Sequence, residues 1–216
     1  MDSCPYSPLN VFGKFEIRQR LSSIICAFTL REKERDMVRR GLLVGRFQPL
    51  HKGHLRAMKD ILEKVDELVI VVGSSQYSHT MENPFTTGER VLMIRRALTE
   101  EDVDPLRYWI IPVPDMHIHM IWVAEVIGYT PKFDTIYTNE PLTRRLFIES
   151  GFNVKPVPFH QREEYSSTEI RERILSKKNW EELVPETVAQ FIREINGAER
   201  LRDLAKTDKA PSSKNK

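Results

Sequence analysis

The stretch GLLVGRFQPLHKGHLRAMKDIL, residues 41–62, decides the fold. Its apolar start, Leu42–Val44, predicts a buried β-strand. From Leu55 to Leu62 the apolar residues recur at helical spacing, which predicts an amphipathic helix. Glycines, an arginine, a proline and two histidines fill residues 45–54 between these elements. The sequence therefore predicts that a buried strand passes into a helix through a short segment whose side chains suit ligand binding.

Strand and helix patterns alternate along the rest of the chain. Further strands are predicted at Glu67–Gly73, Tyr108–Val113, Phe133–Tyr137 and Val154–Val157. Helices are predicted around residues 91–98, 118–128, 141–150, 168–176 and 185–196. The run ELVIVVG, residues 67–73, is apolar without alternation, as expected of a parallel strand covered on both faces. The pattern predicts an α/β fold with a doubly wound parallel sheet. In such sheets ligands bind beyond the carboxyl ends of the strands, where the strand order reverses.

The chain of 216 residues suits a single domain with C-terminal helices, predicted over residues 37–205. Residues 1–36 break the alternation, and we interpret them as a poorly ordered N-terminal extension or as upstream sequence joined by a misplaced start. An extension with a role of its own is the alternative. Residues 206–216 are polar and are predicted to be a disordered tail.

Composition excludes several classes of function. The formal net charge of +2 argues against a nucleic acid as the main partner, although a small anionic ligand remains allowed. Both cysteines, Cys4 and Cys26, precede the predicted domain, so thiol catalysis and cysteine zinc sites are not expected within it. The apolar segment Ser23–Leu30 is too short to span a membrane and lacks a signal-peptide cleavage site. We therefore expect a cytoplasmic protein without a membrane partner.

The segment between the first strand and helix lacks the familiar phosphate loops but suits an anion in another way. Gly45 lets a ligand approach the backbone, and Gly53 leaves the helix entrance open, where free N–H groups favour negative charge. His51 and His54 add two ring N–H donors that are able to carry charge near neutral pH. An alternative is that the two histidines bind a metal ion, although the sequence has no third ligand nearby. Another alternative is that they are incidental surface residues.

A second candidate for anion binding is YSSTEIRER, residues 165–173. Ser166 and Glu169 have the spacing of a capping box, so a well-capped helix start accounts for both. Thr168 adds a hydroxyl that the cap does not need, and Arg171 lies near a helix start, where the dipole does not favour a cation. A bound anion would explain this surplus, and both interpretations remain open.

Two further stretches have simple structural interpretations. Residues 74–90, SSQYSHTMENPFTTGER, fit a loop followed by a helix cap, with Thr86 and Glu89 in capping-box spacing. Residues 112–123, PVPDMHIHMIWV, carry Asp115 and place Trp122 beside an aliphatic run, where a tryptophan is more often part of the core.

These motifs carry a family resemblance. His51-Lys52-Gly53-His54 resembles the His-x-Gly-His signature of the nucleotidyltransferase superfamily, and residues 45–54 resemble the archaeal nicotinamide-nucleotide adenylyltransferases. Residues 166–171 resemble the family's second signature, Ser-x-Thr-x-x-Arg. The stretches at 74–90 and 112–123 resemble the family's acceptor loop and its tryptophan segment. The resemblance covers roughly residues 40–205.

The resemblance implies a Rossmann-like nucleotidyltransferase fold and the transfer of the adenylyl group of ATP to nicotinamide mononucleotide (NMN), which forms NAD and pyrophosphate. It implies catalytic roles for His51, His54 and Arg171. It implies ATP or phosphate binding by Gly45, Arg46, Phe47, Ser166 and Thr168. It implies NMN binding by Trp122 and Asp115. Magnesium that arrives with ATP, and a homo-oligomer, hexameric in relatives, are implied as well.

The chain departs from the family pattern on the acceptor side. His119 stands where relatives tend to have Asn, and Thr138-Asn139-Glu140-Pro141 replaces the commoner Ser-Gly-Asn-Pro. These departures leave the details of acceptor binding open, including the choice between NMN and nicotinic acid mononucleotide. Two other functions remain as alternatives. One is a related transferase that acts on phosphopantetheine, FMN or a sugar-alcohol phosphate, and the other is a nucleotide sensor without turnover.

Overall fold

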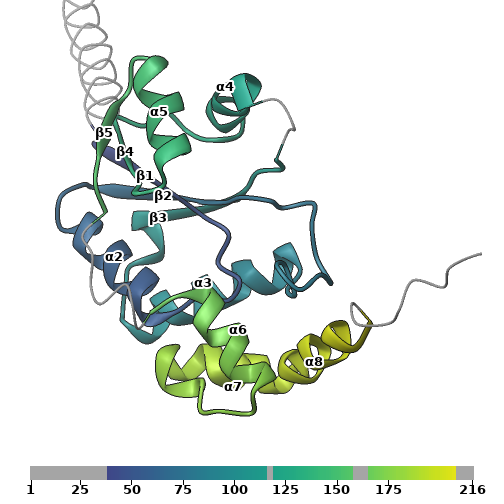
Figure 1. The fold of residues 1–216 in the computed structure, drawn as a ribbon. Helices are drawn as coiled ribbons and strands as arrows, with labels where there is room; N and C mark the ends of the chain where they lie inside the picture. The colour runs from purple at the N-terminus through teal and green to yellow at the C-terminus, as the bar shows by residue number, and fades with distance from the viewer. Residues whose placement is uncertain (1–37, 116–118, 158–164, 208–216) are drawn as a thin grey trace, which may run out of the picture. The chain divides into compact units, whose positions relative to one another are not determined.

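The computed structural model describes residues 38–115, 119–157 and 165–207 (Figure 1). It divides the chain into two units, Met1–Val38 and Arg39–Lys216, and the fold below is that of the second unit. The extension predicted at residues 1–36 lies outside the described residues, and so does the tail from residue 208 onward.

The centre of this unit is one sheet of five parallel strands in the order β3-β2-β1-β4-β5. The strands are β1 (Arg40–Gly45), β2 (Glu67–Val72), β3 (Tyr108–Pro112), β4 (Thr135–Tyr137) and β5 (Asn153–Lys155). From β1 the chain moves outward to β2 and β3, then returns to place β4 on the other side of β1. The predicted doubly wound parallel sheet is confirmed, and its order reverses between β1 and β4.

Helices cover both faces of the sheet (Figure 1). They are α2 (Lys52–Leu62), α3 (Thr87–Glu100), α4 (His119–Tyr129), α5 (Pro141–Glu149), α6 (Ser167–Leu175), α7 (Glu186–Glu194) and α8 (Gly197–Thr207), with short 3₁₀ turns η1 (Pro105–Arg107) and η2 (Glu181–Leu183). Helices α4 and α5 lie on one face, and α2, α3 and the C-terminal helices lie on the other (Figure 1).

The helix predicted around residues 185–196 is confirmed as α7, but it is not the last one, because α8 follows it and was not predicted as a separate helix. Asn196 takes a left-handed φ of 52°, which breaks the helix between α7 and α8. Helix α8 then continues to Thr207, two residues beyond the end predicted for the domain.

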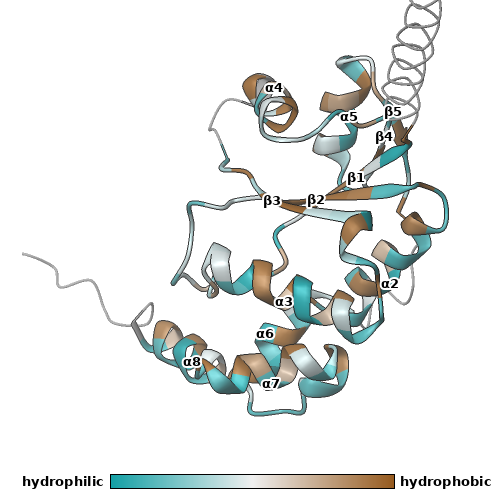
Figure 2. Cartoon of the chain, turned by 180° about the vertical axis from the view of Figure 1, so that it is seen from behind, coloured by the Kyte–Doolittle hydropathy of each residue, from teal (hydrophilic) through white to brown (hydrophobic). Residues whose placement is uncertain are grey.

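Strand β2 shows why the sheet needs two covered faces. Its residues from Leu68 to Val72 are fully buried, and they alternate between two hydrophobic clusters. Leu68 and Ile70 pack with α2 and α3, whereas Val69 and Val71 pack with α4 and α5. Figure 2 shows the complementary pattern in α7 and α8, which carry hydrophobic and hydrophilic residues on different sides.

Ionic contacts at the amino ends of the strands hold the opposite edge of the sheet. Arg40 donates from Nε to the carboxylate of Glu67 at 2.8 Å, and its backbone N–H donates to Asp134 at 2.8 Å. These contacts join β1 to β2 and to the turn before β4. The carboxyl ends are left to loops, which build the site described below.

Because the described fold begins at the start of β1, we predict that a chain starting at Met37 folds with the melting temperature and the turnover of the full-length protein. Thermal melts and steady-state rates of the two proteins measure this. Loss of most activity on truncation would show that residues 1–36 have a role.

Candidate active site

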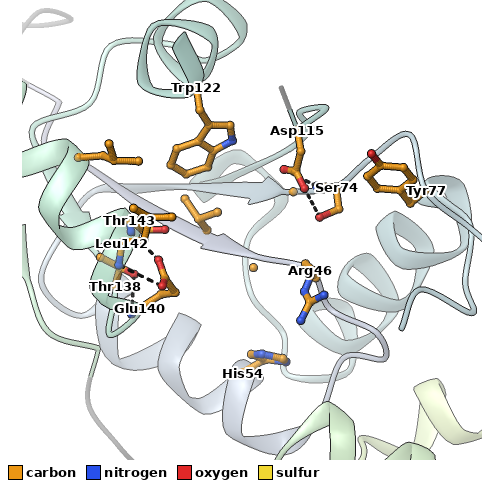
Figure 3. Close-up of a pocket in the computed structure, with 14 residues that line it drawn as sticks. Arg46, His54, Ser74, Tyr77, Asp115, Trp122, Thr138, Glu140, Leu142 and Thr143 are labelled. Carbon is orange, nitrogen blue, oxygen red and sulfur yellow. Dashed lines mark hydrogen bonds between the residues drawn. The ribbon is translucent and has the colours of Figure 1, made fainter. Parts of the chain in front are cut away.

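The carboxyl ends of β1, β2 and β4 open onto a cavity of about 820 Å³ (Figure 3). Its walls are the loops after these strands, the segment after β3, one face of α4 and the start of α5. The side chains labelled in Figure 3 are Arg46, His54, Ser74, Tyr77, Asp115, Trp122, Thr138, Glu140, Leu142 and Thr143. This is the point where the strand order reverses, as expected for a ligand site of such a sheet.

A second cavity of about 310 Å³ adjoins the first. The two share part of their lining, including His54 and Glu140. The smaller cavity extends between the start of α2, at His51 and Gly53, and the residues around the start of α6. The crevice between β1 and β4 thus has two adjoining compartments, and two helix N-termini border the smaller one.

His51 has a structural role that the sequence did not reveal. It is the N-cap of α2, and its Nδ1 accepts a hydrogen bond from the backbone N–H of His54 at 3.2 Å. Histidine is not among the favoured N-cap residues. Because Nδ1 is the acceptor, the ring proton must lie on Nε2, which has no partner among the described residues. The cap therefore fixes the tautomer and leaves one donor free for a ligand.

His54 stacks on His51 with ring centroids 3.5 Å apart, and the edge of Phe47 meets its ring at 4.9 Å. Its Nδ1 is buried and has no hydrogen-bond partner in the parts of the chain that the structure describes, which is costly for a polar atom. Figure 3 shows the ring at the base of the cavity, on α2. A ligand that bonds this ring would add an interaction that the protein alone does not supply.

The two rings are neutral at physiological pH in the ligand-free protein. Burial lowers the pKa of His51 from its usual 6.5 to about 4. Burial also lowers the pKa of His54 well below its usual value, and the adjacent His51 ring lowers it further. The expectation that each is able to carry positive charge near neutral pH is therefore wrong for the ligand-free state, although both remain N–H donors.

Two arginines supply the positive charge. Arg171 on α6 donates to the backbone oxygen of Gln48 at 2.8 Å and more weakly to Thr168 Oγ1 at 3.4 Å. Burial lowers the pKa of Arg171, and the positive charge of Arg46 lowers it further, so the two cations act on the same region. Arg46 is 56% exposed, and its nearest carboxylate, on Glu82, is 3.9 Å away. Two mutually repelling cations beside helix N-termini favour an anionic ligand.

The start of α6 is built differently from the prediction. Ser166 caps the helix and accepts the backbone N–H of Glu169 at 3.0 Å, as expected. The capping box is wrong, because the Glu169 carboxylate pairs with Arg173 at 2.7 Å instead of returning to the Ser166 backbone. The Oγ of Ser167 donates to the backbone oxygen of Pro49 at 3.0 Å. The two motifs singled out in the sequence thus touch directly.

The two glycines of the first motif make room for neighbours. A Cβ on Gly45 would lie 2.7 Å from the ring of Phe47, which is almost fully buried. A Cβ on Gly53 would lie 3.0 Å from Tyr165 and 3.1 Å from the cap nitrogen of His51. Tight packing thus gives each glycine a role apart from any approach of a ligand.

Asp115 and Trp122 line the far side of the larger cavity (Figure 3). The Asp115 carboxylate accepts the backbone N–H of Ser74 at 3.1 Å and also its hydroxyl. Trp122 packs edge-on against Phe147 at 5.6 Å while it also lines the cavity, so it belongs to both the core and the site. The side chain of His119 lies outside what the structure describes.

Sequence reasoning missed several residues of the site. Glu140 caps α5 and accepts the backbone N–H of Leu142 at 3.0 Å and that of Thr143, and it lines both cavities. The only feature of the sequence that pointed to Glu140 was the departure from the family pattern at residues 138–141. The side-chain amide of Gln48 bonds both the N–H and the oxygen of Phe85 at 2.9 Å, a contact that the resemblance of residues 45–54 did not reveal.

A metal site made by the protein alone is not found. In the described parts of the chain no group of three or more His, Cys, Asp or Glu side chains is arranged to hold a metal ion. The two candidate histidines stack on each other, and the Nδ1 of one caps a helix. Among the described residues, no helix is both long enough and apolar enough to cross a membrane.

Comparisons with known proteins agree with this geometry. The sequence profile of the "Cytidylyltransferase-like" family matches residues 42–173. The nicotinamide-nucleotide adenylyltransferase of Saccharolobus solfataricus is 52% identical over 170 residues, which cover 79% of this chain and 99% of the relative. That of Thermococcus kodakarensis is 48% identical over 169 residues, which cover 78% of this chain and 90% of the relative.

Solved structures support the fold. A bifunctional NMN adenylyltransferase/ADP ribose pyrophosphatase from Francisella tularensis superimposes with a TM-score of 0.66 at 21% identity. The match covers 83% of this chain but only 59% of that one, so this chain spans about three-fifths of the bifunctional protein. Another structure of that protein, described as complexed with AMP and a manganese ion, gives a TM-score of 0.65 at 20% identity, with 83% and 58% of the two chains covered.

The motif at the end of β1, the second motif at the start of α6 and the extent of the sequence matches agree. This chain belongs to the cytidylyltransferase-like family and, within it, to the archaeal-type nicotinamide-nucleotide adenylyltransferases.

Proposed function

We propose that this protein transfers the adenylyl group of ATP to NMN and so forms NAD and pyrophosphate. The observation that carries the proposal is the meeting of two helix starts, α2 with its paired histidines and α6 with Arg171, beside a cavity walled by Trp122. Relatives about 50% identical bear the corresponding name and are covered almost end to end.

In this proposal the triphosphate of ATP lies between the starts of α2 and α6. The backbone N–H groups and dipoles at both starts favour its negative charge. His51 donates from Nε2, because its Nδ1 is committed to the helix cap. Arg171 is already oriented by Gln48, and Arg46 lines the larger cavity from the loop after β1, so pyrophosphate leaves against two cations. Ser166 and Thr168, at the start of α6, are the remaining phosphate ligands that we propose.

The reaction needs no covalent intermediate. The phosphate of NMN attacks the α-phosphorus while pyrophosphate departs on the opposite side, and such transfers depend on positioning and charge stabilisation. Neutral histidines suit this role, because they donate hydrogen bonds without holding the leaving group as tightly as a cation would. We assign His51 and His54 to the charge that develops on the bridging oxygen.

The acceptor occupies the larger cavity in this proposal. Its volume of about 820 Å³ lies within the range of small-ligand sites. The nicotinamide ring stacks on Trp122, and the loop held by Asp115 and Ser74 borders it. The adenosine of ATP extends into the smaller cavity beside Tyr165 and Asn139.

We propose that magnesium enters with ATP. No protein-only cluster for a metal is present among the described residues, and the Asp115 carboxylate in the larger cavity already bonds Ser74. The triphosphate and water would therefore supply most of the oxygen ligands, which is the usual coordination of Mg²⁺ at nucleotide sites. When bound, the ion neutralises phosphate charge. The family resemblance further leads us to propose a cytoplasmic homo-oligomer, a hexamer by that resemblance, which sedimentation of the purified protein measures.

The proposal is tested by offering ATP and Mg²⁺ with a panel of acceptors: NMN, nicotinic acid mononucleotide, phosphopantetheine, FMN and a sugar-alcohol phosphate. Mass spectrometry identifies the product. We expect NAD from NMN with release of pyrophosphate. A product from another acceptor alone would identify a related transferase, and ATP binding without pyrophosphate release from any acceptor would identify a sensor.

His54→Ala should lower kcat by about 10²–10³ while the protein stays folded, because one donor to the developing charge is lost. The KM for NMN should change little, since the ring of NMN lies away from the triphosphate. Steady-state kinetics, metal analysis and melting curves of the variant measure these effects. Near-normal turnover in a folded variant would contradict the assignment, and loss of bound metal with a lower melting temperature would support metal ligation instead.

Trp122→Ala should weaken NMN much more than ATP, because a lost ring stack of about 1–3 kcal/mol affects one substrate only. The matched control is Trp109→Ala on β3, a half-exposed tryptophan that bonds Glu67 and does not line either cavity. The Michaelis constants of both substrates decide the matter. Equal weakening of both substrates by Trp122→Ala, or unfolding, would assign Trp122 to the core alone.

The lowered pKa of His51 predicts a pH dependence of stability. Between pH 6.5 and about 4 the unfolded chain binds a proton at His51 that the folded, ligand-free protein does not. The free energy of unfolding should therefore fall as pH falls through this window, by about 3 kcal/mol at most from this side chain. His51→Asn keeps a side-chain oxygen for the cap and removes the titration.

Urea denaturation from about pH 7 to about pH 4.5 measures this effect in both proteins. The wild type should lose stability more steeply with falling pH than His51→Asn. Equal slopes would show that the His51 ring is not held neutral by burial.

A further inference from the structure

The most deeply buried cation of the described chain lies outside the residues assigned so far. Arg90 on α3 is fully buried, yet its guanidinium makes five hydrogen bonds. Nη1 donates to the backbone oxygens of Arg46 (3.0 Å) and Gly73 (2.8 Å), Nη2 to Ser74 O (3.1 Å) and Thr87 Oγ1 (2.9 Å), and Nε to Thr86 O (3.4 Å). All five acceptors are neutral, and no described carboxylate forms an ion pair with this side chain.

The bonds of Arg90 lie directly behind the wall of the larger cavity. Arg46, Gly73 and Ser74 all line that cavity. The ladder between β1 and β2 ends where the N–H of Gly73 donates to Gly45 O at 3.0 Å. Immediately beyond this point the two strands continue into loops. Nη1 of Arg90 joins these loops, because it donates to the backbone oxygens of both Arg46 and Gly73. The guanidinium thus continues the cross-strand bonding past the end of the sheet.

Both loops contain a turn that is unfavourable for their residues. Phe47 has a φ of 51° and Ser74 a φ of 50°, and neither is a glycine. Left-handed conformations of such residues persist when the surrounding structure holds them. Arg90 bonds the carbonyl just before Phe47 and the carbonyl of Ser74 itself. It is therefore placed to hold both turns at once.

Each turn orients a group of the proposed site. The turn at Phe47 follows Arg46, whose guanidinium faces the phosphate region. The turn at Ser74 directs its N–H and hydroxyl to the carboxylate of Asp115 on the acceptor side. One buried side chain therefore connects the phosphate side and the acceptor side of the cavity.

If Arg90 served only to join the two loops, its side chain would not need a positive charge. Burial of a guanidinium is unfavourable, and here it lowers the pKa of Arg90 to about 10 although the nearby Asp115 carboxylate acts to raise it, so the side chain stays charged at neutral pH. Fixed positive charge behind the cavity wall would attract a polyanion bound on the other side of that wall.

We propose that Arg90 is a positioning residue of the adenylyl transfer: it holds the loops after β1 and β2 so that Arg46 meets the phosphates while Asp115 and Ser74 shape the acceptor side. This inference rests on the proposed function for its kinetic part. Its binding part concerns ATP alone and stands without that function.

The chain offers a matched control in Arg200 of α8. Its guanidinium bonds both carboxylate oxygens of Glu89 at 2.8 Å and the backbone oxygen of Pro84 at 3.2 Å. It therefore holds the start of the same helix, α3, but it bonds none of the residues that line either cavity. Loss of Arg200 should destabilise the protein without moving the loops after β1 and β2.

The experiment compares Arg90→Met, Arg90→Lys and Arg200→Met with the wild type in kcat, both Michaelis constants, ATP affinity by calorimetry and melting temperature. We expect Arg90→Met to lower kcat by about 10²-fold and to raise both Michaelis constants, as displacement of reacting groups by an ångström does. Arg90→Lys keeps the charge and has three donors for five acceptors, so its loss in kcat should be about tenfold. Arg200→Met should lose melting temperature but keep its kcat within about threefold of the wild type.

Three results would overturn the proposal. The first is a folded Arg90→Met with wild-type kinetics and ATP affinity. The second is a loss of activity that follows melting temperature equally in Arg90→Met and Arg200→Met, which would assign a purely structural role. The third result applies if Arg90→Met does not fold, and it is an Arg90→Lys variant that has the wild-type kcat at a lowered melting temperature. Absence of NAD formation by the wild type would sink the proposed function alone, because ATP affinity still separates Arg90→Met from Arg200→Met.

Discussion

The contact between the start of α6 and the loop after β1 is the interaction on which the site depends. Arg171 and Ser167 bond the backbone oxygens of Gln48 and Pro49, more than a hundred positions earlier in the chain. Without this contact the two helix starts would face the solvent separately, and neither would hold a long anion alone. With it, both starts border one crevice at the point where the sheet reverses its order.

Charge is distributed unevenly across that crevice. The cations Arg46 and Arg171 act on one region, and the carboxylate of Asp115 lines the larger cavity. Arg46 lines that cavity too, and Glu140 lines both cavities. The histidines are kept neutral by burial. In the proposed function the cations attract the phosphates and the Asp115 carboxylate attracts the positively charged pyridinium ring, which helps to orient the two substrates.

Local patterns in the sequence predicted the fold well. The apolar run of β2, the helical spacing of α2 and the capping box at Thr86 and Glu89 each follow from neighbouring residues, and the structure confirms all three. Features that depend on distant residues were not predictable in this way. Glu169 pairs with Arg173, which in turn reaches Glu182, so the carboxylate expected to complete a cap is drawn elsewhere.

The candidate site shows the same division. Motif spacing placed His51, His54 and Arg171 among the functional candidates. The structure brings the two histidines to one cavity, whereas Arg171 lines neither cavity and is tied to the loop after β1 through its bond to Gln48. The cap role of His51 and its lowered pKa could not be predicted, because burial depends on chains packed from other parts of the molecule. Arg90 ends the stretch 74–90 that resembles the family's acceptor loop, but its role could not be predicted, since its five acceptors come from three separate segments that only the folded sheet brings together.

The most direct test of this account is a crystal structure of the protein with a non-hydrolysable ATP analogue and Mg²⁺. In that structure the triphosphate should lie between the starts of α2 and α6. Its oxygens should lie within hydrogen-bonding distance of His51 Nε2, the His54 ring and the guanidinium groups of Arg46 and Arg171, and the larger cavity beside Trp122 should stay free for the acceptor. A triphosphate bound elsewhere, or one that leaves both histidines without a contact, would contradict it.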